Sequence, residues 1–147
     1  MKVGFICHGN INRSKLAEVI FRQICPQVDC CSYAVGEKSS SGKLFASKMR
    51  KITSDNNYLF EEERSKKATQ SDLEELDLVY IMDKKNYKHM LAQYDLSKLN
   101  IRYFGHLIER DEIPDPGFAK GTELHQLVFQ IIEECCLKLK EEIENED

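Results

Sequence analysis

The N-terminal segment of the chain joins a strand pattern to a helix pattern through a short loop. Residues 2–7 form an apolar run typical of a buried strand. From residue 13 onward, apolar residues recur every three or four positions, which predicts a helix over 13–24 with one buried face. Pro26 ends this helix, because proline cannot continue the hydrogen bonding of a helix interior. A strand that leads directly into a helix is typical of a parallel sheet.

The same alternation continues along the rest of the chain. We expect further strands at 28–35, 78–82 and 101–104, and further helices at 44–52, 84–94 and from 122 onward. The connections are a serine-rich loop at 36–42, an irregular segment at 53–69, and the cap of a short helical turn at 70–72. In the last helix, Cys135 falls on the apolar stripe and Cys136 falls off it, so only Cys135 is expected in the core. These patterns predict one α/β domain over 1–147, with a four-stranded parallel sheet covered by helices on both faces.

Composition excludes several classes of protein. The chain of 147 residues has a formal net charge of −4, which argues against general nucleic-acid binding. No apolar run is long enough to cross a membrane, and the first strand begins at once, so we expect neither a membrane segment nor a secretory signal. The six cysteines include no C-x-x-C motif, and the four histidines are scattered. We therefore expect no metal or other cofactor, and a reducing, cytoplasmic setting.

The loop between the first strand and the first helix has the chemistry of a phosphate site. Gly9 permits a tight turn close to a ligand, and Asn10 tolerates a left-handed backbone. Arg13 begins the helix, where free N–H groups bind anions and a guanidinium can hold two phosphate oxygens. A helix N-terminus and a nearby cation stabilise a thiolate, so we expect Cys7 to attack phosphorus while Ser14 donates a hydrogen bond to its sulfur. The alternative, a buried structural cysteine with a solvated arginine, leaves the other three residues unexplained.

A thiolate that attacks a phosphate ester also requires an acid to protonate the leaving group. Asp115 is the best candidate, in the segment IPDPGF that follows the last expected strand. Two prolines stiffen this segment, and stiff loops on a rigid scaffold suit catalytic groups. Its local sequence alone also fits an ordinary Asp-Pro turn.

Three segments together resemble the low-molecular-weight protein tyrosine phosphatases. Residues 7–18, CHGNINRSKLAE, resemble the signature of that family. Asp115-Pro116 resembles its acid loop, and residues 82–86, MDKKN, resemble its Met-Asp-x-x-Asn segment, so the resemblance spans nearly the whole chain. The resemblance implies a flavodoxin-like fold, a phosphorylated protein as the substrate, and a two-step reaction without metal or cofactor.

The resemblance also implies the roles of the site residues. Cys7 would form a phosphocysteine, Arg13 would stabilise the transition state, and Asp115 would protonate the leaving group and then activate water. The substrate-binding residues would be the loop residues His8, Gly9, Asn10, Ile11, Asn12, Arg13 and Ser14, whose backbone N–H groups from His8 to Arg13 hold the phosphate, together with Phe118. The supporting residues would be Asn10, Ser14, Ser32 and Asp83.

The chain departs from the family pattern at several of these positions. Asn12 stands where a second cysteine is usual, so Cys7 should lack the reversible disulfide that protects such a nucleophile. Gly117-Phe118 stands where two tyrosines are common, and Lys38 falls where an aromatic residue is expected. The aromatic walls of the cleft therefore look thin, with Phe118 as a candidate wall.

Four alternative functions would use the same phosphate-binding loop. A phosphatase of the same mechanism could act on a small or non-tyrosine ester, or on phosphoarginine, although Ile11 stands where arginine phosphatases typically have threonine. An arsenate reductase would need two further cysteines near the middle of the chain, and none lies between 31 and 135. A phosphate-binding module without turnover would not need both Cys7 and Asp115. The sequence gives no prediction of the oligomeric state.

Overall fold

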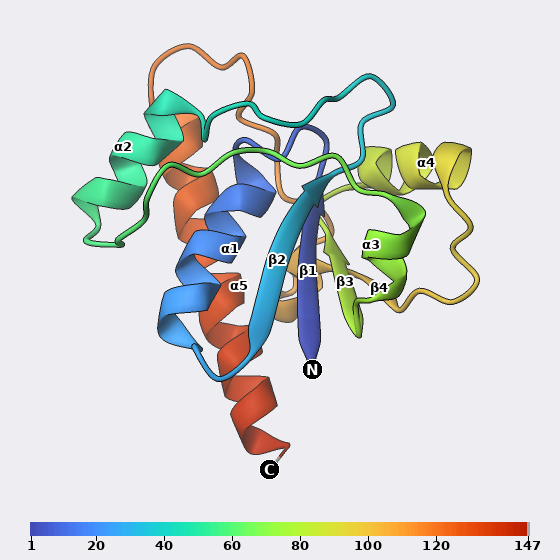
Figure 1. Cartoon of the computed structure of the whole chain (residues 1–147). Helices are drawn as coiled ribbons and strands as arrows, with labels where there is room; N and C mark the ends of the chain where they lie inside the picture. Colours follow the sequence, from blue (N-terminus) through green and yellow to red (C-terminus); the bar gives the residue numbers. More distant parts are fainter. Residues whose placement is uncertain (147) are drawn as a thin grey trace.

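Four parallel strands form the centre of the molecule (Figure 1). They are β1 (Lys2–Cys7), β2 (Asp29–Ala34), β3 (Leu78–Ile81) and β4 (Ile101–Tyr103), hydrogen-bonded in the order β2-β1-β3-β4. The computed structural model describes residues 1–146. The strand order reverses beside β1, and in open parallel sheets the crevice at such a reversal is where ligands bind. The predicted α/β class and flavodoxin-like parallel sheet are confirmed.

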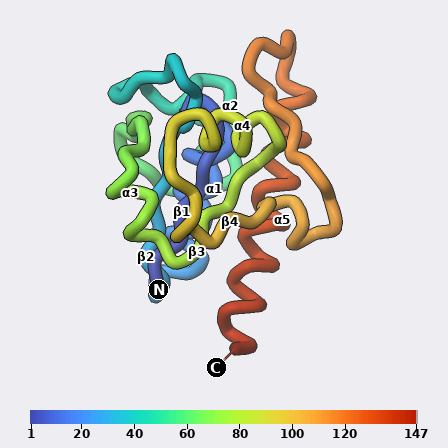
Figure 2. The backbone as a smooth tube through the Cα atoms, turned by 90° about the vertical axis from the view of Figure 1, so that its right-hand side faces the viewer, coloured from blue at the N-terminus to red at the C-terminus, as the bar shows by residue number. Residues whose placement is uncertain are grey.

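Helices cover both faces of this sheet (Figures 1 and 2). One face carries α1 (Arg13–Ile24) and α5 (Glu123–Asn145), with α2 (Ser47–Asp55) packed beside α5. The other face carries α3 (Gln70–Glu74) and α4 (Lys84–Gln93). A short 3₁₀ helix, η1 (Phe104–Ile108), follows β4 and contacts α5. Among the described residues, no helix has both the length and the apolar character needed to cross a membrane.

The strands have apolar side chains on both faces because each face lies under helices. Val3 and Phe5 point into the core beneath α1 and α5, whereas Ile6 points into the core beneath α3 and α4. On β3, Tyr80 and Ile81 divide between the two cores in the same way. Burial on both faces explains why these strands appear in the sequence as continuous apolar runs rather than as alternating ones.

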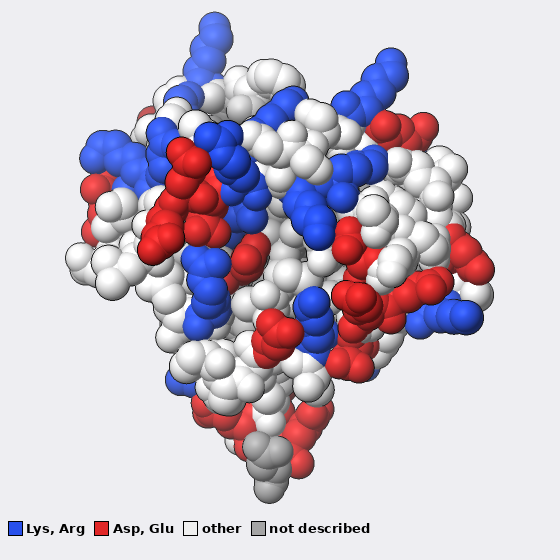
Figure 3. All heavy atoms as spheres, in the orientation of Figure 1, with Lys and Arg blue, Asp and Glu red and all other residues white. Residues whose placement is uncertain are grey.

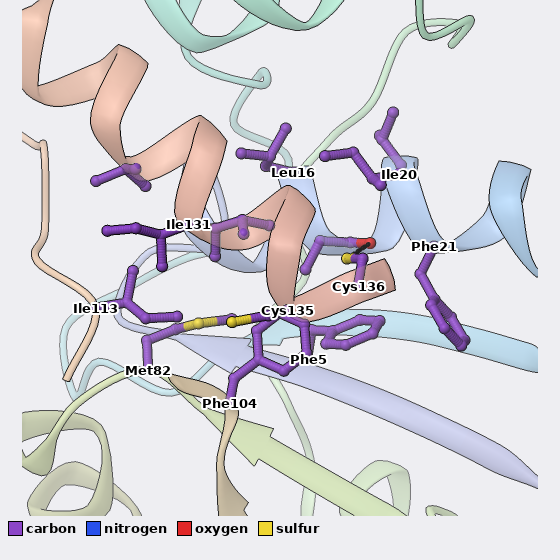
Figure 4. Close-up of a cluster of buried hydrophobic side chains, with 14 of the residues drawn as sticks. Phe5, Leu16, Ile20, Phe21, Met82, Phe104, Ile113, Ile131, Cys135 and Cys136 are labelled. Atoms are coloured by element: carbon purple, nitrogen blue, oxygen red, sulfur yellow. Dashed lines mark hydrogen bonds between the residues drawn. The ribbon is translucent and has the colours of Figure 1, made fainter. Parts of the chain in front are cut away.

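The larger core lies between β1, α1 and α5 (Figure 4), and both adjacent cysteines of α5 belong to it. Cys135 is buried, as predicted, but the expectation that Cys136 lies outside the core is wrong. Because α5 packs against α1 as well as η1, a second side of the helix is covered, and Cys136 Sγ donates to the Ala17 carbonyl at 3.7 Å. Burial raises the pKa of both thiols, that of Cys135 to about 12, so both stay protonated at neutral pH.

Several element boundaries differ from the predicted ones. The helix expected over 44–52 is α2, which begins only at Ser47, because Leu44 is held by an isolated bridge to Arg64 in the irregular connection. The cap expected at 70–72 is Thr69, whose Oγ1 accepts the backbone N–H of Asp72. The 3₁₀ helix η1 replaces the predicted end of the fourth strand and was not expected from the sequence.

Candidate active site

The cysteine loop lies at the carboxyl end of the sheet, where the strand order reverses. Cys7 is the last residue of β1 and Arg13 the first of α1, so residues 8–12 form the turn between them. Both side chains are buried, with 3% and 2% of their surface exposed. Asn10 has a φ of 57°, the left-handed conformation that an asparagine tolerates at small cost. This conformation turns the loop back toward the sulfur.

Asn10 connects the loop to three other parts of the fold. Its Nδ2 donates to Ser14 Oγ at 2.8 Å and to Ser32 Oγ of β2 at 2.8 Å. Its Oδ1 accepts the backbone N–H of Lys66 at 2.9 Å. The side chain is completely buried, and three hydrogen bonds satisfy most of its polar capacity. Asn10 therefore links Ser14, Ser32 and the connection at Lys66 through a single side chain.

The sulfur of Cys7 receives two polar contacts. The backbone N–H of Asn10 points at Sγ from 3.3 Å, and Ser14 Oγ lies 2.9 Å from Sγ. Because Ser14 Oγ already accepts a hydrogen bond from Asn10, its own proton is available for the sulfur. These two donors hold the sulfur in place at the start of the loop.

Arg13 is fixed from behind by two acceptors. Its Nη1 donates to Asp83 Oδ2 at 2.7 Å and to the Ile113 carbonyl at 2.8 Å. Burial alone would lower the pKa of Arg13, but the charges of Cys7 and Asp83 outweigh burial and raise it. Asp83 also caps α4, because its Oδ1 accepts the N–H of Asn86 at 2.9 Å. Asp83 thus joins Arg13 to the start of α4.

The candidate acid approaches the loop from the segment after η1. Ile113 N donates to the Met82 carbonyl at 2.9 Å, which holds this segment at the end of β3. Asp115 Oδ2 lies 3.7 Å from Arg13 Nη2, and Asp115 Oδ1 accepts the N–H of Gly117 at 2.9 Å. The carboxylate is half-exposed, so it faces the space above the loop rather than the core.

A hollow of about 140 Å³ separates the cysteine loop from the segment after η1 that carries Asp115. Its lining residues are Cys7, His8, Gly9, Ile11, Asn12, Arg13, Asp115, Gly117 and Phe118. The structure thus brings the predicted nucleophile, the predicted phosphate-binding residues and the predicted acid around one space. Phe118 lines this hollow from an otherwise exposed position. Asn12 Oδ1 is buried and has no hydrogen-bond partner within residues 1–146.

The ring of His8 forms one side of the entrance. It packs over Gly36, where an added Cβ would lie 2.6 Å from the ring, and against His89, with ring centroids 4.9 Å apart. Burial, followed by the neighbouring His89, lowers the pKa of His8, so this imidazole is neutral at neutral pH.

The hollow opens into a larger cleft of about 900 Å³ between the cysteine loop, α4 and the segment after η1. Beyond His8, Arg13, Asp83 and Asp115, its lining residues are Lys85, Asn86, His89, Arg110, Glu112, Ile113, Pro114 and Phe118. Sequence reasoning missed His89, the Ile113 carbonyl and the N–H of Lys66. Two of these three contacts are made by backbone atoms, which leave no residue-type signal, and His89 was not distinguishable from the other scattered histidines.

Comparison with models of known protein families identifies the family of this chain. The family model described as "Low molecular weight phosphotyrosine protein phosphatase" matches residues 2–147. The chain belongs to this phosphatase family. The predicted resemblance is therefore confirmed.

Curated relatives resemble this phosphatase over most of their length. A putative low molecular weight protein-tyrosine-phosphatase of Synechocystis is 28% identical, with 92% of each chain covered. The low molecular weight protein-tyrosine-phosphatase Wzb of Salmonella typhi is 25% identical, covering 90% of this chain and 87% of Wzb.

Solved structures share the fold of this phosphatase. The protein tyrosine phosphatase of Entamoeba histolytica has a TM-score of 0.86 at 27% identity, covering 99% of this chain and 97% of that one. The YwlE arginine phosphatase of Geobacillus stearothermophilus also has a TM-score of 0.86, covering 99% of this chain and 94% of that one. At 18% identity, this second likeness shows the shared fold alone.

Proposed function

We propose that this member of the phosphatase family hydrolyses phosphotyrosine in proteins through a phosphocysteine on Cys7. The observation that carries the proposal is the convergence of Cys7, Arg13 and Asp115 on one hollow of about 140 Å³. A nucleophile, a planar cation and an acid around a phosphate-sized space are the groups that thiolate-based phosphoryl transfer requires.

In the first step, the thiolate of Cys7 attacks phosphorus while the bond from phosphorus to the phenolic oxygen breaks. Asp115, in its protonated form, transfers its proton to that oxygen, so tyrosine leaves as a neutral phenol. Arg13 and the loop N–H groups hold the remaining phosphoryl oxygens, whose charge they stabilise in the transition state. The ion pair with Asp83 and the Ile113 carbonyl keep the guanidinium in place before the substrate arrives.

In the second step, water attacks the phosphorus of the phosphocysteine. Asp115, now ionised, takes a proton from this water, and the bond from sulfur to phosphorus breaks. Cys7 leaves as a thiolate, which the Ser14 hydroxyl at 2.9 Å and the Asn10 N–H at 3.3 Å stabilise. Inorganic phosphate is then released and the enzyme returns to its starting state.

Two features of the site favour phosphotyrosine as the substrate. Phe118 and His8 line the hollow and offer ring faces to an aromatic leaving group. The cleft beyond the hollow is open enough to admit a protein segment rather than a free metabolite alone. Phosphoarginine is the second candidate, because the same thiolate chemistry can cleave its phosphorus–nitrogen bond. Ile11, which lines the hollow, favours the ester substrate over that alternative.

We place this activity in the cytoplasm, with a phosphorylated protein as the partner and without a metal or other cofactor. All six cysteines are free thiols, and a thiolate nucleophile needs a reducing compartment to stay active.

The test is phosphate release from a phosphotyrosine peptide by the wild type, with Cys7→Ser as the blank. We expect release by the wild type and none by the variant, which should still bind vanadate because Arg13 and the loop are intact. Phosphate release from a phosphoarginine peptide but not from the tyrosine peptide would support the second candidate. Vanadate binding without Cys7-dependent release from any phosphate compound would indicate a binding module instead.

A second measurement tests the role of Asp115 as the acid. Asp115→Asn should slow turnover strongly on phenyl phosphate and weakly on nitrophenyl phosphate, because nitrophenolate leaves without a proton. Equal losses on the two esters would remove Asp115 from the acid role.

A further inference from the structure

We propose that the cleft beside the phosphate hollow selects substrates that carry an acidic residue next to the phosphotyrosine. The inference rests on the proposed function, because it concerns the part of a phosphopeptide that extends past the phosphorylated ring. The residues that carry it are Lys85 and Arg110, which belong to two different segments that line the cleft.

The cleft has room for more than a phosphorylated ring. The hollow above Cys7 measures about 140 Å³, whereas the cleft that continues from His8 and Arg13 measures about 900 Å³. Its far part lies between the first turn of α4 and the segment after η1, which run side by side in Figure 2. The N–H of Lys84 donates to Glu112 Oε2 at 2.9 Å and ties these two segments together. Side chains flanking a bound phosphotyrosine would enter this part.

Every carboxylate that lines the cleft already has a partner. Asp83 accepts from Arg13, and Glu112 accepts from the α4 N-terminus. Asp115 accepts from the N–H of Gly117 and lies 3.7 Å from the guanidinium of Arg13. Two of these carboxylates, Asp83 and Asp115, share the guanidinium of Arg13, and the third, Glu112, is held by a backbone N–H, so none of the three is paired with Lys85 or Arg110.

The two cations of the far part are in the opposite situation. Within residues 1–146, the side chains of Lys85 and Arg110 have neither a hydrogen bond nor an ion pair. Glu109 and Asp111 flank Arg110 in sequence, but neither makes an ion pair with it in the described part of the chain, and Asp111 Oδ1 lies 3.9 Å from His106 Nε2. Two cations without partners on the walls of a cleft favour an anionic side chain of the substrate.

The charge distribution of the surface points the same way. On the face drawn in Figure 3, most Lys and Arg, interspersed with Asp and Glu, lie in the half of the molecule that holds the cysteine loop. The opposite tip, around the C-terminal end of α5, is mostly acidic, with Glu141, Glu142, Glu144 and Glu146. Such an asymmetry attracts anionic peptides toward the cleft end, even though the whole chain carries a net charge of −4.

The test compares phosphotyrosine peptides that differ only in having Glu or Gln on both sides of the phosphotyrosine. The readout is the ratio of kcat/KM for the Glu peptide to that for the Gln peptide, so any change in the basal rate cancels within each variant. We expect the wild-type ratio to exceed about five, and Lys85→Gln and Arg110→Gln each to lower it about two- to fivefold, the range of exposed ion pairs. The ratio should also fall as salt is added, because salt screens exposed charges.

Lys98→Gln is the matched control. Lys98 is an exposed lysine at the amino end of β4, at the other end of the sheet from the cleft, so its loss should leave the ratio unchanged. A wild-type ratio near one, or a ratio that neither cleft variant alters, would overturn the inference.

Turnover of nitrophenyl phosphate separates this result from failure of the proposed function. Cys7-dependent turnover of nitrophenyl phosphate and of both peptides at equal kcat/KM would overturn only the inference about acidic neighbours. Absence of Cys7-dependent turnover on all three would refute the proposed function, and the inference with it.

Discussion

The substitution Asp83→Asn separates two contributions of one carboxylate. Asp83 Oδ2 accepts from Arg13 Nη1 at 2.7 Å, and Asp83 Oδ1 accepts from Asn86 N at 2.9 Å as the cap of α4. Asparagine caps helices about as well as aspartate, so the variant should keep the helix start. It loses the negative charge beside a guanidinium that is only 2% exposed.

The size of the effect follows from these contacts. A hydrogen bond to a charged group contributes about 1.5–3 kcal/mol, so we expect Asp83→Asn to lower the free energy of unfolding by about that amount. Asp83→Ala leaves the buried cation unpaired, at about 3–5 kcal/mol, and removes the cap, at about 1 kcal/mol. If this whole free energy also holds Arg13 in place in the transition state, Asp83→Asn lowers kcat/KM by about 10- to 150-fold, since 1.4 kcal/mol corresponds to a factor of ten.

The assay combines urea unfolding at neutral pH with kcat/KM on a phosphotyrosine peptide. Thr69→Ala is the control, because Thr69 Oγ1 caps α3 by accepting from Asp72 N at 3.0 Å, away from the residues that line the cleft. It should cost about 1 kcal/mol of stability and leave kcat/KM unchanged. If Asp83→Asn loses stability but keeps the wild-type kcat/KM, then Asp83 is structural only and the reasoning about Arg13 is refuted.

Three further predictions concern the cleft walls and a buried histidine. Gly36→Ala places a Cβ 2.6 Å from the His8 ring, so KM for a phosphotyrosine peptide should rise several-fold; a wild-type KM would show that the ring position is irrelevant. Phe118→Ala should raise KM for aryl phosphates but not for alkyl phosphates, and equal changes would contradict its role as an aromatic wall. Burial lowers the pKa of His125, so the unfolded chain takes up a proton at higher pH than the folded one, and stability should fall as the pH drops below about 6.5. His125→Gln should reduce this loss in urea unfolding at pH 7.5 and 5.5; equal losses in both proteins would exclude His125 as a source.

Residues close together in sequence were predictable because their constraints are local. The loop from Cys7 to Ser14 showed its chemistry through residue types that suit a turn, a helix start and a nucleophile. Asn10 was recognised as a residue that tolerates a left-handed backbone, and it adopts one, with φ at 57°. The buried strands were readable because cover on both faces leaves only apolar side chains.

Other features depended on tertiary packing and left no such signal. Cys136 lies off the main stripe of α5, and only the contact of α5 with α1 buries it. The contact of His8 with His89 joins the loop to α4 across the mouth of the cleft, at a separation that no sequence pattern reveals. The Ile113 carbonyl that holds Arg13 is a backbone atom, so any residue at that position could supply it.

The three hydrogen bonds of Asn10 limit how far the cysteine loop can be treated as a portable motif. Its amide binds Ser14 within the motif, but it also binds Ser32 on β2 and the N–H of Lys66 in the irregular connection. An octapeptide copied from residues 7–14 into another strand-loop-helix scaffold would therefore carry the reactive groups without the two distant anchors. A working transplant would have to bring along an acceptor at the position of Ser32 and a free amide at that of Lys66.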